Sequence, residues 1–91
     1  MIADGLEGID GIPHRVCIVG SGPVGLALAT RLAARNVPVL VLESGGIAAN
    51  RNVQELADGE RVDPAVHDDL MVATSRQLGG TSNLWGARVL P

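Results

Sequence analysis

The 91-residue chain has no phenylalanine, tyrosine or lysine, and it has one tryptophan, Trp85, and one cysteine, Cys17. With so few aromatic rings it has no stacking platform for nucleic-acid bases. A single cysteine allows neither an internal disulfide nor a multi-cysteine zinc site. Seven arginines against ten acidic residues leave a net charge of −3, which attracts neither nucleic acid nor an anionic membrane. We therefore expect no nucleic-acid partner, no membrane partner and no metal.

Long hydrophobic runs are also missing. No stretch approaches the ~20 apolar residues of a membrane helix. The first fifteen residues contain Asp4, Glu7 and Asp10 and no apolar run, so they do not form a secretory signal. These features favour a cytoplasmic protein. We interpret residues 1–13, which are rich in glycine and acidic residues, as a flexible leader before one small domain over residues 14–91.

The apolar residues that are present, mainly Val, Leu, Ala and Ile, favour an α/β fold. Val16 to Val19 is a continuous apolar run, typical of a strand that is buried on both faces, and Cys17 is expected to pack inside it. Residues 26–34 predict a helix whose end is marked by Asn36, and residues 37–42 predict a second strand. A strand, helix and strand of this length form a right-handed parallel crossover. The fold class is therefore a Rossmann-like βαβ dinucleotide-binding unit.

The C-terminal half gives weaker signals. Asp63-Pro64 predicts the start of a helix that keeps a rough helical spacing to Leu78, although residues 72–78 fit an extended segment equally well. Ser82 predicts the start of a further helix.

The sharpest motif is a glycine-rich turn between the first strand and the helix. Its first glycine permits the tight turn, its second lets a pyrophosphate approach the backbone, and its third lets the helix pack against the strand. The pyrophosphate would lie at the helix N-terminus, where free N–H groups favour negative charge. The residues are Gly20, Ser21, Gly22, Pro23, Val24 and Gly25. No lysine follows the turn, which excludes a mononucleotide P-loop.

Glu43 ends the second strand, eighteen residues past Gly25. An acid at this spacing accepts hydrogen bonds from the adenosine ribose and repels a 2′-phosphate, which disfavours NADP. The alternative is that the turn is merely tight and Glu43 is a solvated acid.

Two further motifs resemble the glucose-methanol-choline (GMC) family of FAD-dependent oxidoreductases, nearest its bacterial pyranose and glycoside oxidase branch. They are Glu43-Ser44-Gly45-Gly46 and Arg76-Gln77-Leu78-Gly79-Gly80-Thr81-Ser82-Asn83-Leu84-Trp85-Gly86. The resemblance implies an incomplete FAD-binding domain without the C-terminal substrate portion. It also implies a complete enzyme that oxidises a CH–OH group of a sugar or other alcohol by hydride transfer to flavin.

The resemblance implies roles for individual residues. The glycine-rich turn would hold the FAD pyrophosphate, and Glu43, in its motif with Ser44, the adenosine ribose. Arg76 would face either the phosphates or a carboxylate. The residues expected along the pyrophosphate and flavin are Gly79, Gly80, Thr81 and Ser82.

The chain also departs from the family. Leu84 stands where one branch has a histidine bonded covalently to FAD, so we expect non-covalent FAD. The family's catalytic base is a C-terminal histidine that has no counterpart here, and His14 and His67 are expected to be solvated. We therefore assign no catalytic residue and expect the chain alone to be inactive. Two alternatives stay open: an NAD-binding module, and a non-functional remnant that binds no cofactor.

Overall fold

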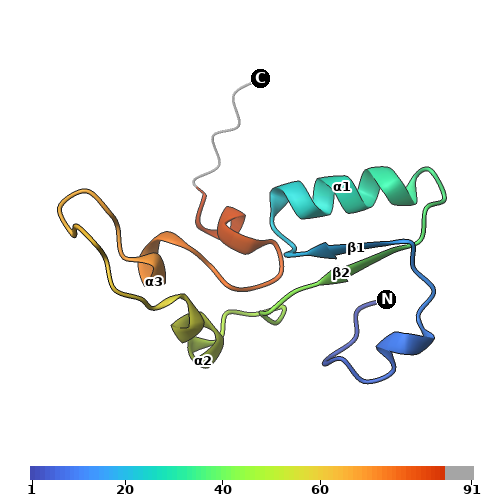
Figure 1. The fold of residues 1–91 in the computed structure, drawn as a ribbon, viewed down its shortest axis with the longest axis horizontal. Coiled ribbons are helices and arrows are strands. Elements are labelled where there is room, and N and C mark those ends of the chain that lie inside the picture. Colours follow the sequence, from blue (N-terminus) through green and yellow to red (C-terminus); the bar gives the residue numbers. More distant parts are fainter. Residues whose placement is uncertain (86–91) are drawn as a thin grey trace.

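The computed structural model describes residues 1–85 and is built on two parallel strands with one helix packed against them (Figure 1). Strand β1 (Val16–Val19) leads into helix α1 (Pro23–Ala33), which returns the chain to strand β2 (Val39–Leu42). The strands pair in register, with Val16 opposite Val39 and Val19 opposite Leu42. This confirms the Rossmann-like βαβ unit.

The two ends of α1 explain where its neighbours begin. The helix starts at Pro23, earlier than expected, because Gly22 caps it in extended backbone and proline suits the first helical position. At the other end Asn36 has a φ of 57°, and the Val37 N–H donates to the carbonyl of Leu32 at 3.0 Å. The helix itself ends at Ala33, and the left-handed Asn36 marks its end as predicted. The cap uses the Val37 N–H in a hydrogen bond to the helix. For this reason β2 starts at Val39 rather than at residue 37.

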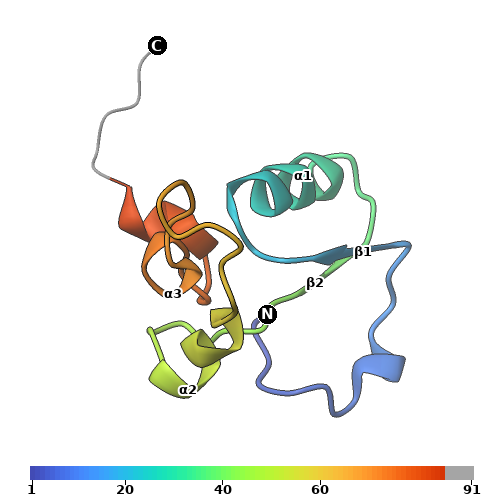
Figure 2. The ribbon, with the colours of Figure 1, turned by 60° about the vertical axis from the view of Figure 1, so that its left-hand side comes forward.

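The two faces of the sheet differ in burial. Helix α1 lies over one face (Figures 1 and 2), where Ile18 is 9% exposed. On β1, Cys17 is exposed and Val19 is 83% exposed. The predictions that β1 is buried on both faces and that Cys17 packs inside it are therefore wrong for the described residues. The apolar run makes β1 suitable for burial on both faces. In the described structure, however, α1 covers one face only, and Val19 stays exposed.

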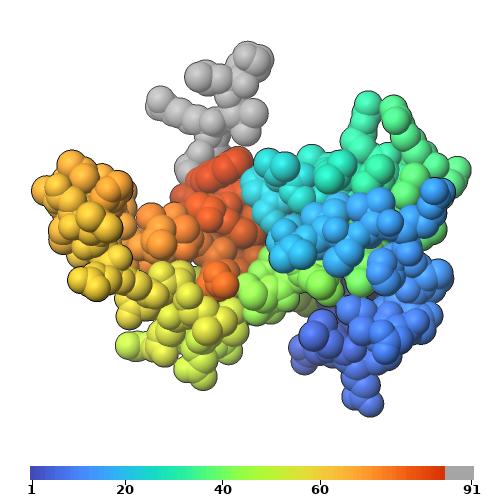
Figure 3. All heavy atoms as spheres, viewed as in Figure 1, coloured from blue at the N-terminus to red at the C-terminus, as the bar shows by residue number. Residues whose placement is uncertain are grey.

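The other regular elements of the described chain are short helices. They are η1 (Ile9–Gly11), α2 (Arg51–Gln54), η2 (Glu55–Ala57), α3 (Leu70–Ala73) and η3 (Gly80–Leu84). Figure 1 shows residues 50–85 gathered beyond the carboxyl ends of both strands, and Figure 3 shows the same part of the chain, yellow to red, beside the βαβ unit. This is the edge at which parallel α/β sheets bind their ligands.

Two helix predictions in this half are wrong in their bounds. Asp63 caps a single turn, in which its carboxylate accepts from the Ala65 N–H at 2.9 Å. The helix α3 begins after Asp69, whose carboxylate caps it through the Met71 N–H at 2.9 Å. It ends at Ala73, so no helix continues to residue 78. Of the alternative extended segment over residues 72–78, the first two residues are helical and Thr74 is extended. The helix expected from Ser82 is the 3₁₀ turn η3, which begins at Gly80; its expected continuation past Trp85 lies outside the described residues.

Within residues 1–85, none of the helices combines the length and the apolar character needed to cross a bilayer. Residues 1–13 carry η1 and are mostly exposed. The leader boundary at residue 13 stays a prediction.

Candidate functional site

The glycine-rich turn connects β1 to α1 and is fixed at both ends. Gly20 has a φ of 97°, a conformation that glycine adopts without steric cost, and its N–H donates to the Leu42 carbonyl at 2.7 Å. A Cβ atom on Gly25 would overlap the carbonyl oxygen of Gly20. On Gly22, by contrast, a Cβ would meet no atom within 4 Å. Gly25 is therefore needed for packing, whereas the space beside Gly22 is open.

Replacing Gly25 by alanine should lower the free energy of unfolding by about 1–3 kcal/mol, because the added methyl group overpacks the contact with Gly20. The direction of the change in the free energy of unfolding is informative, because replacing glycine by alanine inside a helix ordinarily stabilises a protein by roughly 1 kcal/mol. Urea unfolding of Gly25→Ala beside Gly22→Ala, which has no such contact, measures it. A Gly25→Ala variant more stable than the wild type would contradict the packing.

Glu43 connects the end of β2 to the turn through four hydrogen bonds. Its Oε2 accepts from the Ser21 N–H at 2.9 Å and from the Ser21 hydroxyl. Its Oε1 accepts from the Gly45 N–H at 2.9 Å and from the exposed Ser44 hydroxyl at 3.2 Å. Burial by itself raises the pKa of Glu43, but the hydrogen bonds from Ser21, Gly45 and Ser44 outweigh it and lower the pKa to about 2. The carboxylate is therefore ionised at neutral pH.

This lowered pKa makes stability depend on pH. A carboxyl group whose pKa is lower in the folded state stabilises the fold above its unfolded pKa, and this contribution is lost as the pH falls. For Glu43 the loss is expected from pH 4.5 down to about 2. Urea unfolding across that range should show a smaller decline in the Glu43→Gln variant than in the wild type. Identical declines would show that Glu43 does not contribute.

The glycine pair at Gly79 and Gly80 lies against the turn, although 58 residues separate the two segments. The Gly79 N–H donates to the Ser21 hydroxyl oxygen at 3.2 Å. A Cβ on Gly80, whose φ is 61°, would lie 3.0 Å from the Cα of Gly22. The Ser82 hydroxyl donates to the Gly79 carbonyl at 2.6 Å and closes this turn on itself. The missing Cβ of Gly80 thus permits a direct backbone approach to the turn, and Gly79, with a φ of 91°, has a conformation that favours glycine.

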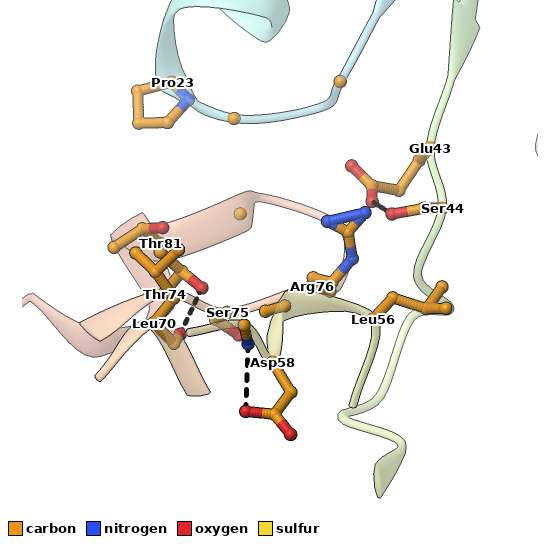
Figure 4. Close-up of a pocket in the computed structure, with 15 residues that line it drawn as sticks. Pro23, Glu43, Ser44, Leu56, Asp58, Leu70, Thr74, Ser75, Arg76 and Thr81 are labelled. Carbon is orange, nitrogen blue, oxygen red and sulfur yellow. Dashed lines mark hydrogen bonds between the residues drawn. The ribbon is translucent and has the colours of Figure 1, made fainter. Parts of the chain in front are cut away.

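Arg76 is held in place by its backbone. Its N–H donates to the Gln54 side-chain oxygen at 2.9 Å, and its carbonyl packs so closely on Gly45 that a Cβ there would overlap it. The side chain reaches toward the region of Glu43 and Ser44 (Figure 4). Its Nε is buried and has no hydrogen-bond partner among the described residues. A guanidinium whose Nε has no hydrogen-bond partner within residues 1–85 is suited to an anionic ligand.

These segments surround an open cavity of about 630 Å³. The predicted site residues that line it are Gly20, Gly22, Pro23, Glu43, Ser44, Arg76, Gly80 and Thr81. The others lie behind it or beside it: Ser21 is 0% exposed, Val24 is 82% exposed, and Gly25, Gly79 and Ser82 have the packing and bonding roles described above.

Sequence reasoning missed the far wall of the cavity and the residue that supports it. The wall consists of Leu56, Ala57, Asp58, Gly59, Leu70, Thr74 and Ser75. Gln54 supports it, since its side-chain amide donates to the carbonyls of Met71 and Thr74 at 3.0 and 2.8 Å. No motif marks these residues, because they come from short helices and the loops beside them.

Among the described residues, no group of three or more His, Cys, Asp or Glu side chains is placed to hold a metal ion. His14 is exposed and its Nδ1 lies 2.9 Å from the Ile12 carbonyl oxygen, and His67 is exposed as well. Neither histidine lines the cavity.

Comparison with known proteins gives one match. The profile of the NAD(P)-binding Rossmann-like domain matches residues 18–68, more than half of the chain. This stretch contains the glycine-rich turn and Glu43. No curated protein and no solved structure matches significantly.

Proposed function

The chain belongs to the family of NAD(P)-binding Rossmann-like domains, and from this premise we propose that its cavity binds the adenosine diphosphate half of FAD. The observation that supports the proposal most strongly is the convergence of three separate motifs on one cavity. The glycine-rich turn, Glu43 and the segment from Arg76 to Thr81 all contribute to its lining.

The residues present fit a dinucleotide. Gly22 leaves open the space that a side chain would fill, at the N-terminus of an eleven-residue helix whose free N–H groups favour phosphate. The buried Nε of Arg76 is a positive donor with no partner in the described protein. Gly22 with the start of α1 would hold the pyrophosphate, and Arg76 would face it.

The two oxygens of Glu43 would have different roles. Oε2 is engaged with buried Ser21, whereas Oε1 is shared with the exposed hydroxyl of Ser44, its longest hydrogen bond. A ribose hydroxyl can replace that bond at little cost, because Ser44 can turn to water instead. We therefore assign Oε1 as the oxygen that accepts from the ribose.

The choice of FAD and of the reaction rests on the resemblance to the GMC family. Gly79 and Gly80 approach the turn without side chains, as expected where the chain runs along a flavin dinucleotide. The proposed complete enzyme oxidises a CH–OH group of a sugar or other alcohol. When bound, the flavin supplies the hydride acceptor, and the residues described here bind and orient it.

Titration calorimetry of the protein with FAD, ADP, NAD⁺ and FMN tests the proposal. We expect FAD to bind most tightly, ADP to retain part of the affinity, and FMN, which lacks the adenosine half, to bind poorly. NAD⁺ binding as tightly as FAD would favour the NAD module instead. Absence of binding by FAD, ADP and NAD⁺ would identify a remnant and overturn the proposal.

Bound FAD is expected to be held without a covalent bond. Leu84, at the position of the histidine that bonds FAD in the pyranose oxidase branch, has no nucleophilic atom. Its neighbours Asn83 and Trp85 offer none. After acid precipitation of the FAD-loaded protein, all the yellow colour should stay in the supernatant, as with a mixture of FAD and serum albumin. Colour in the protein pellet would contradict this prediction.

A further inference from the structure

Ser21 occupies the second position of the glycine-rich turn, where the motif places no requirement on the side chain. It is nevertheless the one residue among those described that is 0% exposed. Its hydroxyl donates to Oε2 of Glu43 and accepts from the Gly79 N–H at 3.2 Å. Its own N–H donates to the same carboxylate oxygen at 2.9 Å.

The hydroxyl therefore joins three segments that are far apart in sequence. Glu43 follows β2, Gly79 belongs to the glycine pair, and Ser21 itself lies between β1 and α1. A buried hydroxyl offers one donor and two acceptor positions, and both kinds are used here. No other side chain in the described structure bonds both Glu43 and the glycine pair.

We infer that Ser21 is a positioning residue for the nucleotide site. It orients Glu43 so that Oε1 faces the cavity, and it holds the Gly79-Gly80 turn against Gly22. The expected effect of Ser21 on nucleotide affinity rests on the proposed function. The positioning of Glu43 and Gly79 by Ser21 does not, because it is present in the ligand-free protein.

The consequence is that one side chain outside the cavity lining controls both the ribose contact and the approach of the glycine pair. Without the hydroxyl, Glu43 keeps only the backbone donor of Ser21 on Oε2, and the Gly79 N–H loses its acceptor. The Gly80 N–H keeps its own partner, the Gln77 carbonyl at 2.8 Å, whatever happens at Ser21. Gly80 is therefore an internal reference for Gly79.

The test compares wild type, Ser21→Ala and Ser21→Cys by NMR in the ligand-free protein. Ser21→Ala should raise the exchange rate of the Gly79 amide roughly tenfold relative to Gly80 and raise the pKa of Glu43 followed at its carboxyl carbon. Ser21→Cys preserves the size of the side chain but has a weak donor and acceptor, so it should behave like Ser21→Ala. ADP affinity should fall roughly tenfold in both variants.

The outcomes separate the two proposals. If wild type fails to bind ADP but the Gly79 and Glu43 changes appear, the proposed function fails and the positioning by Ser21 stands. Unchanged Gly79 exchange and an unchanged Glu43 pKa in Ser21→Ala would overturn the inference. So would wild-type behaviour of Ser21→Cys, which would show that size matters rather than the hydroxyl. Equal acceleration at Gly79 and Gly80 would also overturn it, because it indicates general loosening.

Discussion

Replacing Gly22 by valine should abolish FAD binding while the protein keeps its fold. In the ligand-free structure a Cβ at this position meets no atom within 4 Å, and the φ of −67° is open to any residue. The branched side chain would fill the part of the cavity that borders the N-terminus of α1, where the pyrophosphate is proposed to lie. Because the valine side chain would keep the pyrophosphate out of this space, FAD would lose its phosphate contacts and its ribose contact together.

Calorimetric titration with FAD, paired with a thermal melt, measures both halves of this prediction. Gly11→Val is a matched control, because a Cβ there also meets nothing within 4 Å and Gly11 does not line the cavity. It should bind FAD like the wild type. Wild-type FAD affinity in Gly22→Val would remove the glycine-rich turn from the binding site, whereas a lost melting transition would show that Gly22 serves the fold.

The βαβ unit was predictable because its signals are local. The apolar run of Val16 to Val19 and the left-handed cap at Asn36 depend on a few neighbouring residues. What covers a strand does not depend on its own sequence, and for this reason the interior position expected for Cys17 was wrong.

The same limit applies to the second half of the site. Asp63-Pro64 predicted the start of a helix, yet α3 starts after Asp69. Gln54 bonds the backbone at Met71, Thr74 and Arg76 and so fixes where this segment runs. A single glutamine in a polar stretch gives no sign of such long-range bonds. Convergence of the glycine pair on the turn was implied by resemblance alone.

Arg76 carries the second large expected effect. From the sequence its partner was either a phosphate or a carboxylate. In the structure its side chain lines the cavity, and its Nε has no partner within residues 1–85. The carboxylate of Glu43 meanwhile has four hydrogen bonds from Ser21, Ser44 and Gly45. These observations favour the phosphate.

Arg76→Gln should therefore weaken ADP binding by roughly 10- to 150-fold, the equivalent of about 1.5–3 kcal/mol for a hydrogen bond to a charged group. Adenosine, which has no phosphate, should bind both proteins equally. Arg35→Gln removes the same charge from an exposed position outside the cavity and should leave ADP affinity close to that of the wild type.

A third ligand, 2′,5′-ADP, shows which phosphate Arg76 contacts. A loss of affinity confined to this ligand would place Arg76 at the ribose 2′ position. Equal losses for ADP and adenosine would mean that Arg76 supports the cavity wall through its backbone contacts with Gln54 and Gly45 and does not bind phosphate.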